Sequence, residues 1–493
     1  MRRTWTIIPA LVSLGLFFTG CEESSLSPGR ETEQAKLYHY VNTFAFNSLR
    51  AYYLWNEEIE GALKNWKDAD EPIGKVKEVR YKDSAGNDID RWTLLTDDYA
   101  SFYGNASGIE KTYGFDFLGT LYDNDHYALV VTYTYAGSPA EEAGLKRGDL
   151  IVQLNGKLIP IDNVNAVVNQ ELRHSESVTL TLNSGETVPL TVREMYEDPV
   201  LFSRIFDCGG KKVGYLHYTS FTLDSYRELI DISKTFRAAG VSELILDLRY
   251  NQGGFAIAEE FLASMLVPEE EVLAGSILST NIYNSRLTEL YAQQGTDTNT
   301  YLQNSFRFTS PDKKVYDFST ADANMGISKL YVIVSNITAS ASESLIGDLI
   351  PYLDVTLVGR QTHGKYCTGW MRQGSAFYNT VTETMSDEEK AEGKKYTENW
   401  GLYMMIARFA DKNGVTHCMP DGIQPDYPVR DNPTDGYALG NPNETMLAKT
   451  LSLCGYKSTA PTAGRASVSD RTTEPELIDL HGEGSGLRIM LPE

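Results

Sequence analysis

An apolar strand that runs directly into a helix, residues 330–349, restricts the fold of this chain more than any other stretch. The β-branched run ends at Val334, a short polar turn follows, and leucine and isoleucine then recur at helical spacing up to Leu349. Ser340 therefore lies where a strand passes into a helix. The first turn of a helix offers N–H groups without helical acceptors and a positive dipole end, which suits a nucleophile that generates an anion. Ser340-x-x-Glu343 is also the pattern of a capping box, in which the serine only satisfies that first turn.

Further strand and helix patterns surround this stretch. Strands are expected at residues 214–221, 244–249 and 355–359, and helices at 224–239, 256–266 and 445–453. Two more sheet strands are expected at residues 369–382 and 400–409. Strands that alternate with helices favour an α/β core with a largely parallel sheet.

The rest of the chain divides by composition. Residues 1–20 read as a signal peptide, 21–35 as a polar tether and 36–107 as a helical subdomain. Short alternating strands with glycine punctuation fill residues 108–197, the α/β core takes 198–455, and 456–493 read as a flexible tail rich in small and polar residues.

The N-terminus indicates export. Arg2 and Arg3 precede an apolar stretch that is too short to favour a spanning helix. Phe18-Thr-Gly-Cys21 resembles a bacterial lipobox, which implies cleavage before Cys21, lipidation of that cysteine and a membrane anchor. The expected location is the bacterial cell envelope, at the outer membrane, facing either the periplasm or the cell surface.

Charge and cysteine content exclude several classes of function. The 67 acidic and 44 basic residues leave a net charge of −23, which opposes binding to nucleic acid or anionic membrane surfaces. The cysteines after Cys21 lack the spacing of a zinc site, so no metal is implied. In an oxidising compartment Cys367 and Cys418 could form a disulfide, but their separation cannot be read from the sequence.

The glycine-punctuated region carries a recognisable order of motifs. Tyr113-Gly-Phe-Asp-Phe117 is followed by the segment 137–156, with Gly-Ser-Pro-Ala-Glu-Glu-Ala-Gly-Leu and then Arg-Gly-Asp-Leu-Ile. This order resembles a PDZ domain. The resemblance implies that Tyr113, Gly114 and Phe115 form the loop whose backbone amides hold a peptide's terminal carboxylate, while the peptide adds a strand to a sheet edge. The alternative is a module that only packs against its neighbours.

Two glycine-bearing turns complete a wider pattern. Leu246-Asp-Leu-Arg-Tyr-Asn-Gln-Gly-Gly254 precedes Ala339-Ser-Ala-Ser-Glu343, and Gly364-Lys365 places the lysine 25 residues after Ser340. Together they resemble the C-terminal processing peptidases of family S41. The resemblance covers about residues 36–450 and implies an S41 core of crotonase-like sheet and helix architecture with an inserted, mostly β PDZ domain.

The resemblance also implies the roles of individual residues. Ser340 is expected as the nucleophile and Lys365 as the general base, which requires a desolvated, neutral amine. The backbone N–H of Ala341, with that of Gly253 or Gly254, is expected to hold the oxyanion. Polypeptides bound through their C-terminal residues are the expected substrates, and no cofactor is needed.

One position departs from the family pattern. Members usually carry glutamine four residues after the lysine, to orient its amine, and this chain has Gly369 there. The orienting contact is expected from Thr368 or another segment, or is missing. A catalytically inactive peptide-binding protein of the same fold is therefore the alternative function. His363 and His217 are weaker candidates for a partner of the serine.

Overall fold

The computed structural model describes residues 32–380, 385–457, 477–481 and 488–491. The expected signal peptide, Cys21 and most of the tether lie outside these residues. The last part of the tether does not, because helix α1 already begins at Glu33, where the hydroxyl of Thr32 accepts a hydrogen bond from the N–H of Ala35 at 3.2 Å. No helix among the described residues has the length and apolarity to cross a bilayer.

The N-terminal elements pack on the α/β core and share its hydrophobic interior. They are α1 (Glu33–Tyr52), α2 (Glu60–Lys64), α3 (Pro72–Val79), β1 (Leu94–Thr96) and α4 (Tyr99–Ala106). Side chains of α1, such as Phe44 and Leu49, belong to the same buried cluster as residues of the central sheets. The expected helical subdomain is therefore continuous in packing with the core.

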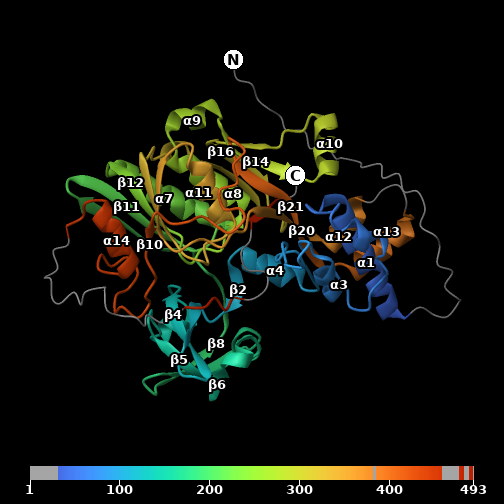
Figure 1. Cartoon of the computed structure of the whole chain (residues 1–493), viewed down its shortest axis with the longest axis horizontal. Helices are drawn as coiled ribbons and strands as arrows, with labels where there is room; N and C mark the ends of the chain where they lie inside the picture. The colour runs from blue at the N-terminus through green and yellow to red at the C-terminus, as the bar shows by residue number, and fades with distance from the viewer. Residues whose placement is uncertain (1–31, 381–384, 458–476, 482–487, 492–493) are drawn as a thin grey trace.

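Residues 108–197 form a β-rich module with a hydrophobic cluster of its own, which lies below the main body in Figure 1. Its six-stranded sheet has the order β3-β4-β6-β5-β7-β8, so β3 is an edge strand. The strands β2 and β9 pair with each other and connect the module to the body. The elements are β2 (Ile109–Thr112), β3 (Phe115–Leu121), β4 (His126–Thr134), α5 (Pro139–Glu142), β5 (Leu150–Leu154), β6 (Lys157–Pro160), α6 (Val164–Val168), η2 (Asn169–Arg173), β7 (Ser177–Leu182), β8 (Thr187–Thr191) and β9 (Arg193–Tyr196).

The main sheet of the core confirms the expected parallel α/β arrangement. Its order is β10-β11-β12-β18-β19-β22, and every pair except β10 with β11 is parallel. The strands are β10 (Val200–Cys208), β11 (Lys211–Tyr218), β12 (Val241–Asp247), β18 (Lys329–Val334), β19 (Asp354–Gly359) and β22 (Tyr427–Pro428). Alternate residues of β12 face opposite sides, so Leu244 packs in the central cluster and Ile245 packs against α14 (Thr445–Leu453).

A second, mixed sheet faces the first across α8 (Ala256–Leu266) and α11 (Ala341–Leu349), whose apolar side chains pack in the central cluster with those of both sheets. Its order is β13-β23-β20-β21-β14-β15, and β1 pairs with β21. The strands are β13 (Gly254–Phe255), β14 (Ile277–Tyr283), β15 (Asn299–Tyr301), β20 (Cys367–Gln373), β21 (Gly401–Asp411) and β23 (Arg488–Met490).

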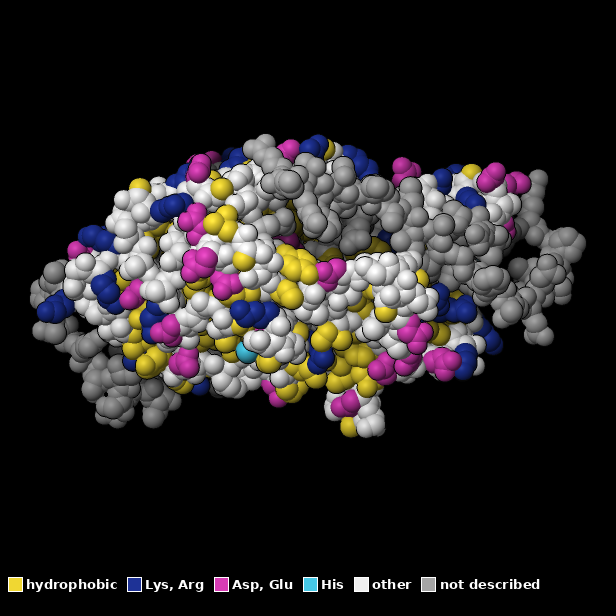
Figure 2. Space-filling view, turned by 90° about the horizontal axis from the view of Figure 1, so that it is seen from above, with side chains coloured by type: hydrophobic (Ala, Val, Ile, Leu, Met, Phe, Trp, Pro, Cys, Tyr) yellow, Lys and Arg dark blue, Asp and Glu magenta, His cyan; other side chains and the backbone are white. Residues whose placement is uncertain are grey.

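The remaining elements cover the body. They are α7 (Tyr226–Ala238), α9 (Glu269–Ala274), α10 (Ser285–Gln294), the hairpin of β16 (Ser305–Thr309) and β17 (Val315–Ser319), α12 (Gly374–Thr380) and α13 (Asp387–Tyr396). Figure 2 shows acidic and basic side chains interspersed over one long face of the molecule, so the negative net charge does not gather into a single patch there.

Two expectations are wrong in part. The strand expected at residues 369–382 ends at Gln373 and continues as α12, because its partner β21 begins at Gly401, opposite Gln373, and offers no pairing beyond it. The flexible tail expected from residue 456 contains ordered segments at 477–481 and 488–491, since β23 fills the gap between β13 and β20.

Candidate active site

Ser340 stands at the N-terminus of α11, in the turn that follows β18. Its backbone has φ 63° and ψ −112°, a left-handed region that costs a non-glycine residue about 1–3 kcal/mol and is found mostly at functional sites. The side chain is buried, and its hydroxyl makes no hydrogen bond within the described part of the chain. The serine therefore does not cap the helix with its hydroxyl, which is left for another role.

Glu343 joins the serine turn to the lysine turn. One carboxylate oxygen accepts hydrogen bonds from the backbone N–H of Ser340 at 2.9 Å and of Lys365 at 2.8 Å. The other oxygen accepts from the hydroxyl of Thr362 at 2.5 Å and the N–H of Gly364 at 2.7 Å. Of the expected capping box, only the glutamate half is formed, and this buried carboxylate brings Ser340 and Lys365 into one site.

Lys365 meets the main requirement for a general base. Its side chain is fully buried, with Nζ 5.4 Å from the ring centre of Trp92. Burial lowers the pKa of Lys365 to about 7, although Cys367, Asp90 and Glu343 act in the opposite direction. A substantial fraction of the amine is therefore neutral near pH 7 and can accept a proton.

Tyr403 supplies a contact that the sequence did not reveal. The Nζ of Lys365 donates a hydrogen bond to the Tyr403 hydroxyl at 3.0 Å. The ring fits because residue 369 is glycine: a Cβ there would lie 2.2 Å from the Tyr403 ring. Tyr403 thus takes up the space next to the lysine that a side chain at residue 369 would need. The lack of a side chain at Gly369 was the only sign of this contact in the sequence, and it did not indicate which residue contacts Lys365.

Replacing Tyr403 by phenylalanine is expected to lower kcat about 10- to 100-fold with little change in KM, because the amine loses an oriented partner while the ring still fills its space. The ammonium form also loses an acceptor, so the pH at which activity appears should move below 7. A pH profile of kcat checks this. An unchanged profile with a proportionate loss at every pH would assign Tyr403 a packing role only.

The second glycine turn lies beside the serine turn, at the carboxyl end of β12. The backbone oxygen of Asn251 accepts from the N–H of Ala339 at 3.2 Å and from the Ser342 hydroxyl at 3.1 Å. The side chain of Asn251 accepts from the N–H of Gly253 at 2.8 Å, so that donor is occupied. Of the expected oxyanion donors, Gly254 and Ala341 remain, and Ala341 is the first residue of α11, where N–H groups lack helical acceptors.

The histidines do not form a serine–histidine pair. The Nδ1 atom of His363 and both ring nitrogens of His217 have no hydrogen-bond partner among the residues that the structure describes. Burial lowers the pKa of each ring to about 4, so both are neutral at pH 7. The possible disulfide is also absent, since Cys367 and Cys418 are both free, buried thiols.

A buried ion network holds the turn after β12 and ties it to the β-rich module. The guanidinium of Arg249 donates to Asp247 at 2.7 Å, to Glu444 at 2.7 Å and to Asp431 at 3.0 Å. Arg147, from the module, donates to the same Asp431 at 2.7 Å. The module is therefore fixed to the core through charges that are almost entirely desolvated, and removing one partner would leave the others uncompensated.

The loop expected to hold a peptide carboxylate faces the same site. Tyr113 and Phe115 line a cavity of about 870 Å³ that is also lined by Gly253 and Gly254. Gly114 has φ 77°, and its N–H donates to the Thr112 hydroxyl at 2.8 Å, so this amide is already engaged. One continuous space therefore connects the loop to the glycine turn beside Ser340.

Comparison with known proteins agrees with this arrangement. Residues 212–429 match the model of peptidase family S41, and residues 130–183 match that of the PDZ domain. A carboxyl-terminal-processing protease of Synechocystis is 31% identical over 245 residues, which cover 48% of this chain and 49% of the relative. The carboxy-terminal processing protease CtpA of Bacillus subtilis is 24% identical over 279 residues, with 55% and 52% covered.

The fold extends further than the sequence similarity. The crystal structure of a Bacteroides fragilis protein assigned to the S41 proteases covers 83% of this chain and 96% of its own, with a TM-score of 0.58 and 23% identity. By sequence, the chain spans about half the length of the curated relatives it matches. The matched region contains Ser340, Lys365, Glu343 and Tyr403.

Proposed function

From an S41 peptidase domain joined to a PDZ domain, we propose that this chain is a serine endopeptidase that cleaves unfolded or C-terminally exposed polypeptides. The observation that carries the proposal is the single buried carboxylate, Glu343, that binds the backbones of both Ser340 and Lys365. A strained serine with an uncommitted hydroxyl and a desolvated lysine in one site are the components of a serine–lysine dyad.

The reaction follows from these groups. The Oγ of Ser340 attacks the scissile carbonyl while the neutral amine of Lys365 takes its proton. Lys365 then gives this proton to the leaving amine, and water hydrolyses the acyl-enzyme with the lysine again as base. The N–H groups of Gly254 and Ala341 bind the oxyanion. Tyr403 orients the amine through its hydrogen bond.

The cavity supports a role for the PDZ module in substrate choice. One cavity of about 870 Å³ is lined by Tyr113, Phe115 and Gly254. A polypeptide whose C-terminus lies at Tyr113 and Phe115 could extend through this cavity toward Gly254. A tail held by strand addition to β3 would therefore present residues upstream of its terminus to Ser340. The site that recognises the substrate's C-terminus and the site that cleaves it would thus share one cavity.

We propose further that the mature protein is held at a membrane of the bacterial cell envelope by a lipid on Cys21. The support is the sequence alone: a short apolar stretch after two arginines, followed by a lipobox-like Phe18-Thr-Gly-Cys21. Replacing Cys21 by serine is the matching variant for a test of membrane association.

The function is tested with two unfolded substrate proteins that differ only at the C-terminus, one ending in apolar residues and one in aspartates. Wild-type protein is expected to cleave the apolar-ended substrate about 10-fold faster in kcat/KM, which corresponds to about 1.4 kcal/mol, because an apolar pocket of the PDZ module would accept an apolar terminal side chain and reject a charged one. Mass spectrometry of the products locates the cuts. Failure of the wild-type protein to cleave either substrate would favour an inactive peptide-binding protein.

A further inference from the structure

A segment near the C-terminus of the chain, residues 477–481, lies on the edge of the PDZ sheet. Ile478 pairs antiparallel with Gly119 of β3, with N–H to O distances of 2.8 Å and 2.9 Å for the two hydrogen bonds. β3 begins at Phe115, the last residue of the expected carboxylate loop Tyr113-Gly114-Phe115. The segment therefore adds to the edge strand beside the proposed carboxylate loop, and its direction leads toward that loop.

The side chains of this segment, here called the C-terminal strap (residues 477–481), fit a site built for them. Leu480 is 3% exposed and belongs to the hydrophobic cluster of the module, against which Ile478 also packs. Gly119 makes room for both: a Cβ there would lie 2.6 Å from Ile478 and 2.8 Å from Leu480. The strap thus places two apolar side chains over a position of β3 that has none.

Polar contacts hold the strap at its end nearest the loop. His481 bonds the carboxylate of Asp116 at 2.8 Å, and the guanidinium of Arg173 donates to the backbone oxygen of Leu480. Burial opposes protonation of His481, but the carboxylates of Asp116 and Asp479 outweigh it and raise the pKa of the ring to about 10. His481 also lines the cavity that leads to Gly254, so the strap stands on the proposed substrate path.

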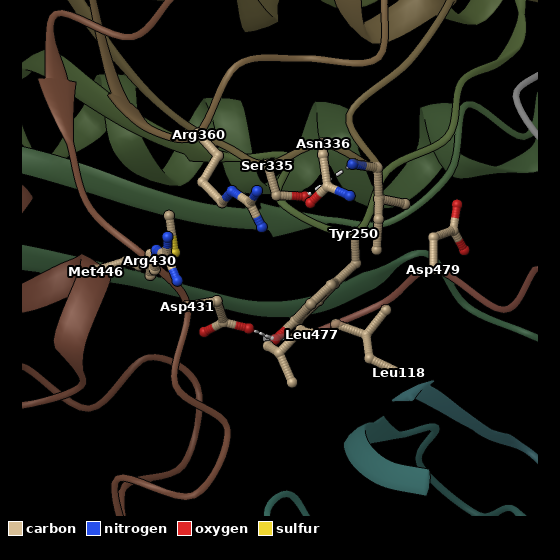
Figure 3. Close-up of a pocket in the computed structure, with 11 residues that line it drawn as sticks. Leu118, Tyr250, Ser335, Asn336, Arg360, Arg430, Asp431, Met446, Leu477 and Asp479 are labelled. Atoms are coloured by element: carbon tan, nitrogen blue, oxygen red, sulfur yellow. Dashed lines mark hydrogen bonds between the residues drawn. The ribbon is translucent and has the colours of Figure 1, made fainter. Parts of the chain in front are cut away.

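The other end of the strap is wedged between the module and the core. Leu477 and Asp479 line a small cavity of about 30 Å³ together with Leu118 of β3 and two arginines of the core, Arg360 and Arg430. Figure 3 shows these side chains around the cavity, where they come from the strap, from β3 and from two separate segments of the core. The strap therefore contacts both units at their junction.

We propose that the C-terminal strap is an intramolecular ligand of the PDZ edge strand and that a polypeptide tail must displace it to bind. This inference rests on the proposed function for the identity of the competitor, an extended polypeptide. The strap is paired less extensively than a permanent strand of a sheet. It makes one isolated bridge, whereas β23 is paired along both of its edges. A tethered ligand at a millimolar effective concentration would weaken the binding of a free tail about 10- to 100-fold.

The first test uses hydrogen exchange on the full-length Ser340→Ala chain, so that no cleavage intervenes. The probe is a fluorescein-labelled peptide with the sequence of residues 476–481 and a free carboxylate. A saturating concentration of this peptide is expected to speed exchange at the amide of Ile478 while the amide of Gly119 stays protected. Binding of the peptide without any change at Ile478 would overturn the proposal.

The second test measures affinity for the same peptide by fluorescence polarisation. In the Ser340→Ala background, Leu480→Asp removes the buried side chain of the strap and should tighten peptide binding about 10- to 100-fold. The matched control is Leu158→Asp, which places the same charge on an exposed residue of β6, 40% exposed and away from the strap, and should leave the affinity unchanged. Truncation is avoided because it would also delete β23.

Each outcome decides between the two proposals. Equal affinity in a folded Leu480→Asp chain, or no binding by any variant, overturns the strap as a ligand. If Leu480→Asp does not fold, the exchange experiment on the unmodified strap still decides. If the peptide displaces the strap in the Ser340→Ala chain but the wild-type protein cleaves no substrate, the proposed peptidase activity is refuted and the inference about the strap still holds.

Discussion

Replacing Ser340 by alanine is expected to lower kcat about 10⁴- to 10⁶-fold, because the change removes the only atom proposed to form a covalent bond with the substrate. The substitution should leave peptide binding intact, since the hydroxyl makes no hydrogen bond in the described structure and its removal therefore breaks none. Thermal stability should also change little. Rates of cleavage of an unfolded substrate, together with the melting temperature, check both statements.

The matched control for this change is Ser344→Ala, one helical turn further along α11. Its hydroxyl donates to Asp348 at 3.0 Å, so its removal should cost stability of about 1 kcal/mol and leave kcat nearly unchanged. Ser340→Ala protein that cleaves as fast as wild type would exclude this serine as the nucleophile.

Replacing Lys365 by methionine is expected to have opposite effects on activity and on stability. Activity should fall about 10⁴-fold or more, since methionine cannot accept a proton. Stability should rise. The folded-state pKa of about 7 lies below the ordinary value of 10.5, so the folded chain binds fewer protons than the unfolded chain between these values. The burial cost is therefore complete below pH 7 and declines toward pH 10.5, with an upper bound of about 5 kcal/mol.

Two measurements check the lysine prediction. Denaturant unfolding at pH 6 and pH 10 should show a larger gain for Lys365→Met at the lower pH. Wild-type activity should rise through about pH 7, where the amine becomes neutral. Lys329→Met is the control: it removes a partly exposed lysine paired with Asp354 at 2.8 Å, and it should change neither the stability nor the activity by much. A loss of stability at pH 6 in Lys365→Met would show that the amine is not buried as a destabilising charge.

Periodicity predicted the core well because local pattern and burial agree there. The helix expected at residues 445–453 is α14 with the same bounds, and the strand and helix around Ser340 are β18 and α11. Errors arose where tertiary pairing decides. Apolar residues continue past Gln373, and only the end of the partner strand converts them to a helix. The pairing of β23 depends on a gap between distant strands, which no local pattern reveals.

The site could be predicted as far as its motifs extend. Ser340, Lys365 and the glycine turns follow from short sequence patterns, and the structure brings the three turns together. Tyr403 could not be found in this way, because it reaches Lys365 across two paired strands, 38 residues away in sequence. The joint role of Glu343 also needed three dimensions, since the capping pattern predicted only its bond to Ser340.

The contact between Gly369 and Tyr403 makes substitutions at these two positions depend on each other. A side chain at residue 369 and a tyrosine at residue 403 would occupy the same volume, because a Cβ at Gly369 falls 2.2 Å from the ring. A side chain added at residue 369 would force the Tyr403 ring to move, and small residues at both positions would remove the hydrogen bond between Tyr403 and Lys365. A side chain that contacts the lysine from residue 369 could therefore be introduced only together with a smaller residue at position 403, as paired substitutions on the neighbouring strands β20 and β21.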